Sequence, residues 1–255
     1  MPRYEVAIAT RNPKVRYLAV NLMKRLGIGF IICAPDEEKC DASQVVITTE
    51  TEVSQFHANR LVVVDEASND DATAIEIMLA LLDIRNPSVI AIGIDPGMKF
   101  GLALVADGVA IYAITASTPR IAANYTFHWM SVIRTHFRSP MLVRVGTGSR
   151  LYSALYLRGI KDRATKRFPI EMVDERHTTR KGESDKSSAT LIASRKGRPV
   201  SDEDFVLNTK AGYIRSLKRL VTKVTEGRLN LTSAQAKSIL LNEITLDEIL
   251  DNANQ

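Results

Sequence analysis

Acidic residues stand at three places where an expected secondary-structure element ends or begins. Asp95 ends a β-branched apolar run and is followed by a Pro-Gly turn. Asp174 and Glu175 follow a second apolar run, and Asp185 precedes small residues and a short apolar segment. Because an unpaired buried carboxylate costs several kcal/mol, the acid at the tip of a buried strand must be hydrated, paired or metal-bound. Each acid also has an ordinary structural interpretation, as a turn former, a surface ion pair or a helix-capping residue.

The elements that must position these acids follow one another in a regular order. The expected order is strand 89–94, strand 102–105, strand 109–115, a helix from 118, strand 141–145, a helix over 150–157, strand 169–173 and a helix to about 195. Asp107-Gly108 is a strong two-residue hairpin turn, and Gly159 is expected to end the helix that begins at Arg150. This order is similar to that of the ribonuclease H-like fold.

Three motifs make the resemblance specific. Residues 92–103, IGIDPGMKFGLA, resemble the first-strand signature of the RuvC and YqgF branch of the ribonuclease H-like superfamily. Residues 173–179, VDERHTT, are similar to the fifth-strand motif of YqgF-like nucleases, and residues 185–193, DKSSATLIA, resemble their last-helix motif. The motifs occur in family order, and the resemblance covers about residues 88–197.

The resemblance implies that Asp95, Glu175 and Asp185 are catalytic acids and ligands of Mg²⁺ or Mn²⁺. Mg²⁺ takes hard oxygen ligands, and carboxylates from different strand ends can hold two metals about 3.5–4 Å apart. One metal would activate the attacking water, and the other would stabilise the leaving 3′ oxygen. Strand alternation puts Asp174 and Glu175 on opposite faces, so only one can face Asp95. The resemblance selects Glu175, and the pattern of residues alone leaves the choice open.

Two departures from the RuvC pattern favour the YqgF branch. RuvC resolvases carry a Glu at the end of the fourth strand, where this chain has RVGTG at 144–148. They also carry a second Asp on the last helix, where this chain has Ser188. The resemblance therefore implies a three-carboxylate nuclease similar to Holliday junction resolvases or pre-rRNA nucleases, acting on structured DNA or RNA.

The N-terminal part has a different pattern. Residues 1–86 alternate short strands and helices, which predicts a small α/β domain of unknown role, with Thr10 capping its first helix. Arg85-Asn86-Pro87 breaks the pattern, so residues 87–255 are expected to form the nuclease domain, with a C-terminal helical extension from about 200. The expected fold class is α/β. It comprises a ribonuclease H-like mixed five-stranded sheet flanked by helices, a small α/β domain before it and helices after it.

Composition narrows the class of protein and of partner. The net charge of +5 fits an anionic partner such as nucleic acid. Two cysteines, Cys33 and Cys40, and no recognisable secretory leader favour reduced thiols in a cytoplasmic protein. The longest apolar stretch, near 75–82, carries Glu76 and is too short to span a bilayer, so no membrane partner is expected. The C-terminal apolar residues could cover the core or a second subunit, which leaves a homodimer open.

Basic residues surround the acidic motifs and could hold phosphates through counterion release. Glycines beside two of the basic clusters, Gly182 and Gly197, would let the backbone approach a phosphate closely. A solvated basic surface is the plain alternative for any single residue. The candidates for nucleic-acid binding are Lys99, Arg150, Arg176, Arg180, Lys181, Arg195, Lys196 and Arg198.

Two other functions compete with a nuclease. The first is a catalytically silent nucleic-acid-binding module of the same fold, against which the three retained acids argue. The second is a sugar- or acetate-kinase-like ATPase, whose first phosphate loop also contains Asp-x-Gly. Such kinases are longer and carry a Gly-Gly adenosine motif that this sequence lacks.

Overall fold

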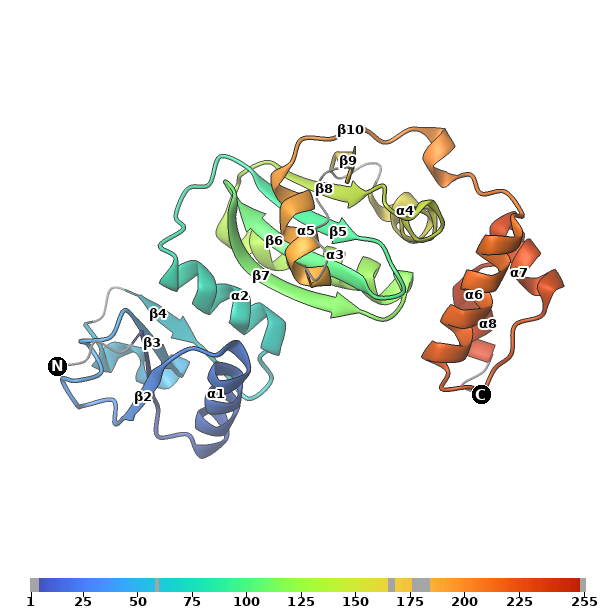
Figure 1. Cartoon of the computed structure of the whole chain (residues 1–255). Helices are drawn as coiled ribbons and strands as arrows, with labels where there is room; N and C mark the ends of the chain where they lie inside the picture. The colour runs from blue at the N-terminus through green and yellow to red at the C-terminus, as the bar shows by residue number, and fades with distance from the viewer. Residues whose placement is uncertain (1–4, 58–59, 165–167, 176–183, 253–255) are drawn as a thin grey trace. The chain divides into compact units, whose positions relative to one another are not determined.

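The chain forms two compact units, residues 1–87 and 88–255 (Figure 1). The computed structural model describes residues 5–57, 60–164, 168–175 and 184–252. Each unit is built around its own sheet, and the two sheets confirm the mixed α/β class. The boundary falls one residue beyond the one predicted from the Arg-Asn-Pro break.

The N-terminal unit is a parallel sheet with strand order β2-β1-β3-β4. Both of its α-helices follow strands, and they contact each other. The elements are β1 (Val6–Ala9), α1 (Pro13–Leu26), β2 (Phe30–Cys33), β3 (Val45–Thr48), the 3₁₀ helix η1 (Glu50–Gln55), β4 (Leu61–Val63) and α2 (Asp70–Leu81).

The start of α1 differs from the prediction. Asn12, not Thr10, caps the helix, because its side chain accepts hydrogen bonds from the backbone N–H groups of Lys14 and Val15. The Thr10 hydroxyl instead donates to the buried carboxylate of Glu52, at 2.6 Å. Thr10 therefore ties the end of β1 to η1.

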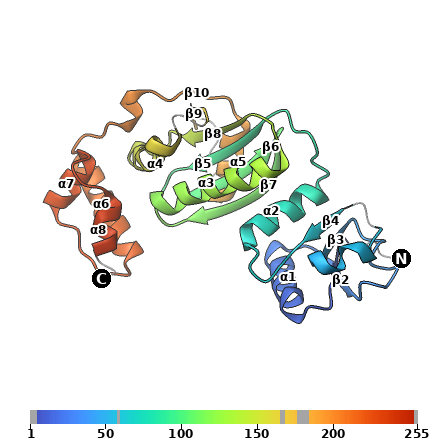
Figure 2. The same ribbon diagram turned by 180° about the vertical axis from the view of Figure 1, so that it is seen from behind.

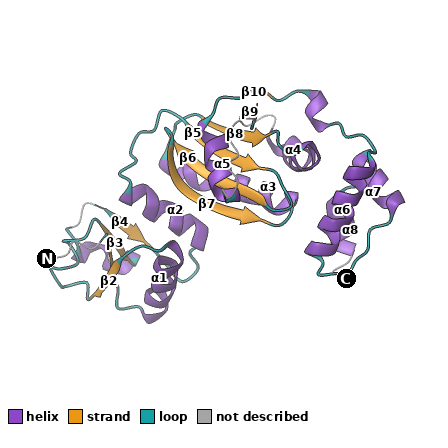
Figure 3. Ribbon diagram, in the orientation of Figure 1, coloured by secondary structure: helices purple, strands orange, loops and turns teal. Residues whose placement is uncertain are grey.

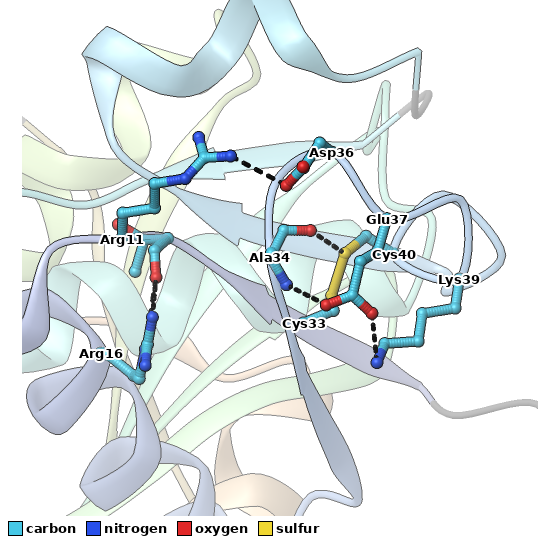
Figure 4. The surroundings of a disulfide bond; sticks show 9 residues. Arg11, Arg16, Cys33, Ala34, Asp36, Glu37, Lys39 and Cys40 are labelled. Atoms are coloured by element: carbon cyan, nitrogen blue, oxygen red, sulfur yellow. Dashed lines mark hydrogen bonds and ion pairs between the residues drawn. A yellow bond between two sulfur atoms is a disulfide. The ribbon is translucent and has the colours of Figure 1, made fainter.

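The two cysteines form a disulfide, so the expectation of reduced thiols is wrong (Figure 4). Cys33 ends β2, and the bond to Cys40 closes the intervening loop back onto that strand. Within the loop, the Glu37 carboxylate accepts a hydrogen bond from the backbone N–H of Ala34 at 2.9 Å. The sequence contained no signal for this folding-back, because it depends on how the loop packs.

The C-terminal unit contains a six-stranded mixed sheet with strand order β10-β9-β8-β5-β6-β7 (Figure 3). Strands β5, β8 and β9 run parallel, and the remaining neighbours are antiparallel. The sheet has one strand more than predicted, because two residues after α5 pair with β9 and are too few to show a periodicity. The strands are β5 (Ile90–Asp95), β6 (Phe100–Ala106), β7 (Val109–Ala116), β8 (Met141–Gly146), β9 (Ile170–Val173) and β10 (Arg198–Pro199).

Helices cover both faces of this sheet (Figures 1 and 2). Helix α5 (Asp185–Ser194) lies across β5 and β6 on one face, and α3 (Pro119–His136) lies on the other. Helix α4 (Arg150–Ala164) packs beside α3 and continues through Gly159, which was expected to end it. A Cβ at Gly159 would lie 3.8 Å from the Ala123 side chain, so this glycine faces the contact between α3 and α4.

The C-terminal helices pack against α3 and α4 of their own unit. They are the 3₁₀ helix η2 (Asp202–Phe205), α6 (Ala211–Val224), α7 (Ser233–Leu240) and α8 (Leu246–Asn252). The Arg158 guanidinium of α4 donates to the backbone carbonyls of Phe205, Ile239 and Leu240 at 2.9–3.0 Å. Arg120 of α3 forms a bidentate ion pair with Asp251 of α8. A homodimer stays a prediction. No helix among the described residues is long and apolar enough to cross a membrane.

Candidate functional site

Asp95 is the last residue of β5, opposite Gly101 in the register with β6. Its side chain is half-buried, and the Ser188 hydroxyl of α5 donates a hydrogen bond to it. Burial and the nearby charges of Glu175 and Asp185 raise the pKa of the Asp95 carboxyl to about 6. Asp95 is therefore an acid at a strand tip that two other carboxylates face closely enough to affect its ionisation.

Glu175 reaches the site from the chain that follows β9. Its Oε1 accepts a hydrogen bond from the backbone N–H of Gly148, at 2.9 Å. A Cβ at Gly146 or at Gly148 would overlap the Glu175 carboxylate. Gly146, the last residue of β8, and Gly148, two residues further on, thus leave the space that Glu175 occupies, in the region where RuvC-type enzymes carry an acid. Its neighbour Asp174 is exposed.

The packing of α5 against the sheet positions Asp185. Ser184 caps the helix by accepting from the backbone N–H of Ser187, which places Asp185 in the first turn. Two strand residues beneath the helix are glycines, Gly93 and Gly101. A Cβ at either would overlap backbone atoms of α5, so the missing side chains let the helix approach the strand that carries Asp95.

The donor chemistry of these three carboxylates fits a hard divalent cation. Their mutual repulsion at Asp95 is the electrostatic condition that a cation would relieve. Among the described residues, however, no group of three His, Cys, Asp or Glu side chains is arranged closely enough to hold a metal ion. The carboxylates therefore have to draw closer together before they can share one cation.

The predicted basic residues have different surroundings. Arg198 is held by Asp204 through two hydrogen bonds of 2.6 and 2.7 Å, and Arg150 donates to the backbone carbonyls of Glu203 and Val206. Both guanidinium groups thus have partners within the chain. Lys99 and Lys196 are exposed, and Arg195 is half-buried. Arg176, Arg180 and Lys181 lie outside the described residues.

Sequence analysis missed the residues that organise the site without being acids. Ser188 was noted only as the absence of a second Asp, yet it donates to Asp95. Arg144 bridges three elements, since it donates to Glu171 of β9 at 2.8 Å and to the Ala193 carbonyl of α5 at 2.6 Å. The glycines inside buried strands were the one available signal, because such positions often mark a close backbone approach.

The N-terminal unit is similar to a known protein family. A family model described as a response regulator receiver-like domain matches residues 5–82. The match lies within the N-terminal unit and covers less than a third of the chain. No curated protein matches the chain. The similarity therefore describes the N-terminal unit and does not bear on the acidic site.

Proposed function

We propose that the C-terminal unit is a metal-dependent nuclease that cleaves phosphodiester bonds in structured DNA or RNA. Asp95, Glu175 and Asp185 act as its catalytic acids and as ligands of Mg²⁺ or Mn²⁺. The observation that carries the proposal is that these acids, separated by up to 90 positions, come from the end of β5, the chain after β9 and the start of α5 to one edge of the sheet, where the charges of Glu175 and Asp185 raise the pKa of Asp95. Repulsion between neighbouring carboxylates destabilises the folded chain, and a cation bound between them would relieve that repulsion.

The roles of the surrounding groups follow from their contacts. A bound Mg²⁺ or Mn²⁺ would supply Lewis acidity and a nucleophilic water. The Gly148 N–H orients the Glu175 carboxylate, and the Ser188 hydroxyl orients that of Asp95. Lys99, in the turn after Asp95, is exposed and available to a phosphate near the cleaved bond.

A second candidate is a nucleic-acid-binding module of the same fold that does not cleave. The specific observation in its favour is that no three-donor metal arrangement exists among the described residues. In this alternative the acids would remain apart, and the unit would bind phosphates through its basic surface alone.

A cleavage assay separates the two candidates. The wild-type chain and the Asp95→Asn variant would be incubated with branched DNA and with structured RNA, with Mg²⁺, with Mn²⁺ and with a chelator. We expect cleavage by the wild type that needs the metal and that falls by at least a hundredfold in the variant, equivalent to about 2.7 kcal/mol of barrier. Cleavage that persists in Asp95→Asn contradicts the site assignment, and binding without cleavage by the wild type favours the silent module.

A further inference from the structure

Helix α6 and its N-cap carry a concentration of positive charge that the proposed site does not use. No Asp or Glu occurs between Asp204 and Glu226. The same interval contains five cations, Lys210, Arg215, Lys218, Arg219 and Lys223. In a chain with 34 basic and 29 acidic residues, a helix with cations only is a local departure from the average.

Three of these cations form a row. Arg215, Arg219 and Lys223 follow one another at intervals of four residues, and all three are exposed. Residues four apart lie on the same face of an α-helix, so neighbouring members are about 6 Å apart along the axis and the row is about 12 Å long. A nucleic-acid duplex carries one phosphate charge per about 1.7 Å with both strands counted and one per about 3.4 Å on a single strand, so this length spans about three or four phosphates of one strand.

Within the described part of the chain, the row has no counter-ions. None of Arg215, Arg219 and Lys223 forms an ion pair with another described residue. Lys218, beside the row, donates to the Ser233 hydroxyl at 2.9 Å. Like charges four residues apart destabilise a helix slightly, so an anionic partner would relieve a repulsion that the fold leaves in place.

The opposite face of α6 excludes a membrane as the natural partner. Leu217, Leu220 and Val221 are fully buried, and α6 packs against α7. A helix that binds a membrane surface must place its apolar face among the lipids. Because that face is already covered, α6 can offer its basic side only, and a phosphate backbone is the polyanion that such a row fits.

The position of α6 connects the row to the acidic site. Helix α6 packs against α7, and the backbone carbonyls of Ile239 and Leu240 at the end of α7 accept hydrogen bonds from the Arg158 guanidinium of α4. Helix α4 begins directly after the glycine turn that holds Glu175. The basic row therefore belongs to a helix that is connected through α7 to the element leading out of the site.

We propose that Arg215, Arg219 and Lys223 of α6 form a nucleic-acid-binding row that holds the phosphate backbone beside the acidic site. The proposal rests on the proposed function for the class of its partner. The row contributes to binding and not to cleavage. It is distinct from the basic candidates near the acidic motifs.

The test compares two variants with equal loss of charge. The row variant is Arg215→Gln, Arg219→Gln and Lys223→Gln, and the control is Lys24→Gln, Lys39→Gln and Arg85→Gln, three exposed cations of the N-terminal unit. Glutamine keeps a high helix propensity, so α6 should stay folded, which circular dichroism checks. Binding of a labelled DNA duplex and a labelled RNA stem-loop is measured without divalent ions, between about 50 and 200 mM salt.

We expect the row variant to bind more weakly and its plot of log affinity against log salt to become shallower by about 2–3, since each phosphate contact contributes about 0.9. The control should keep the wild-type slope. An unchanged slope in the row variant, an equal change in the control, or wild-type binding to anionic vesicles and not to nucleic acid would overturn the proposal. Asp95→Asn separates the two proposals. Without divalent ions it lacks one carboxylate of the site, so it should bind nucleic acid at least as tightly as the wild type does, whereas continued cleavage by this variant would contradict the nuclease and leave the row's result standing.

Discussion

At the scale of single residues, Asp95 determines what the site can do. Its carboxyl is half-buried, faces Glu175 and Asp185, and accepts a hydrogen bond from Ser188. Burial and the two acids raise its pKa to about 6, and the Ser188 hydroxyl opposes that rise. Without a cation, Asp95 is therefore partly protonated near neutral pH. A cation bound among the acids would lower its pKa and return it to the ionised form.

The raised pKa predicts how stability depends on pH without divalent ions. A carboxyl whose pKa is higher in the folded than in the unfolded chain binds more protons when folded, so stability falls as pH rises. The contribution of Asp95 to the free energy of unfolding is fully present below about pH 4 and is lost as the pH rises through about 6. Asp95→Asn should therefore be more stable than the wild type at pH 8, with a smaller difference at pH 4.5. Thermal melts at both pH values measure this, and a difference that does not change with pH would contradict the assigned pKa.

Gly146 tests whether a missing side chain positions Glu175. A Cβ there would overlap the Glu175 carboxylate and would lie 2.8 Å from Cδ1 of the buried Ile192, so both side chains would have to shift. Gly146→Ala should therefore destabilise the C-terminal unit by about 1–3 kcal/mol, the usual cost of overpacking. It should lower cleavage at least tenfold. Gly29→Ala, in the N-terminal unit, where a Cβ would meet no atom within 4 Å, is a control for cleavage. Full activity in Gly146→Ala would mean that Glu175 need not occupy this position.

At the scale of elements, the packing of α5 against β5 and β6 brings Asp185 to the site. Gly93 and Gly101 allow this close packing, because a Cβ at either would overlap backbone atoms of the helix. Backbone cannot move aside as a side-chain end can. Gly101→Ala should therefore destabilise the C-terminal unit by about 1–3 kcal/mol, the usual cost of overpacking. Denaturant unfolding measures the change, and unchanged stability would show that α5 does not need this close approach.

The sequence predicted the order of the elements better than their ends. Apolar runs and the Asp107-Gly108 turn gave the first three strands of the C-terminal unit, because burial and turn chemistry are local signals. Gly159 was misleading, since its role is a contact between helices that local patterns do not contain. The candidate acids were predicted through the resemblance. Their supporting residues, such as Ser188, become visible only when α5 and β5 are placed together.

At the scale of the whole molecule, the two units carry different features. The N-terminal unit carries the disulfide, and the C-terminal unit has the acidic site and the basic row. In the chain-entropy description, a disulfide that closes so short a loop stabilises by about 2–3 kcal/mol. A reductant should lower the stability of the N-terminal unit by up to this amount and leave cleavage unchanged. Unfolding followed by hydrogen exchange resolves the units, and loss of cleavage on reduction would show that the site depends on the disulfide.

The central claim is that Asp95, Glu175 and Asp185 together form one cation-binding site. The most direct measurement is the unfolding temperature of the wild type, Asp95→Asn and Glu175→Gln as Mg²⁺ or Mn²⁺ is added at pH 8. The wild type should gain stability by mass action, about 2.7 kcal/mol when the cation is at a hundred times its dissociation constant. Each variant should gain far less. Equal stabilisation of all three proteins, or none in the wild type, would contradict the claim.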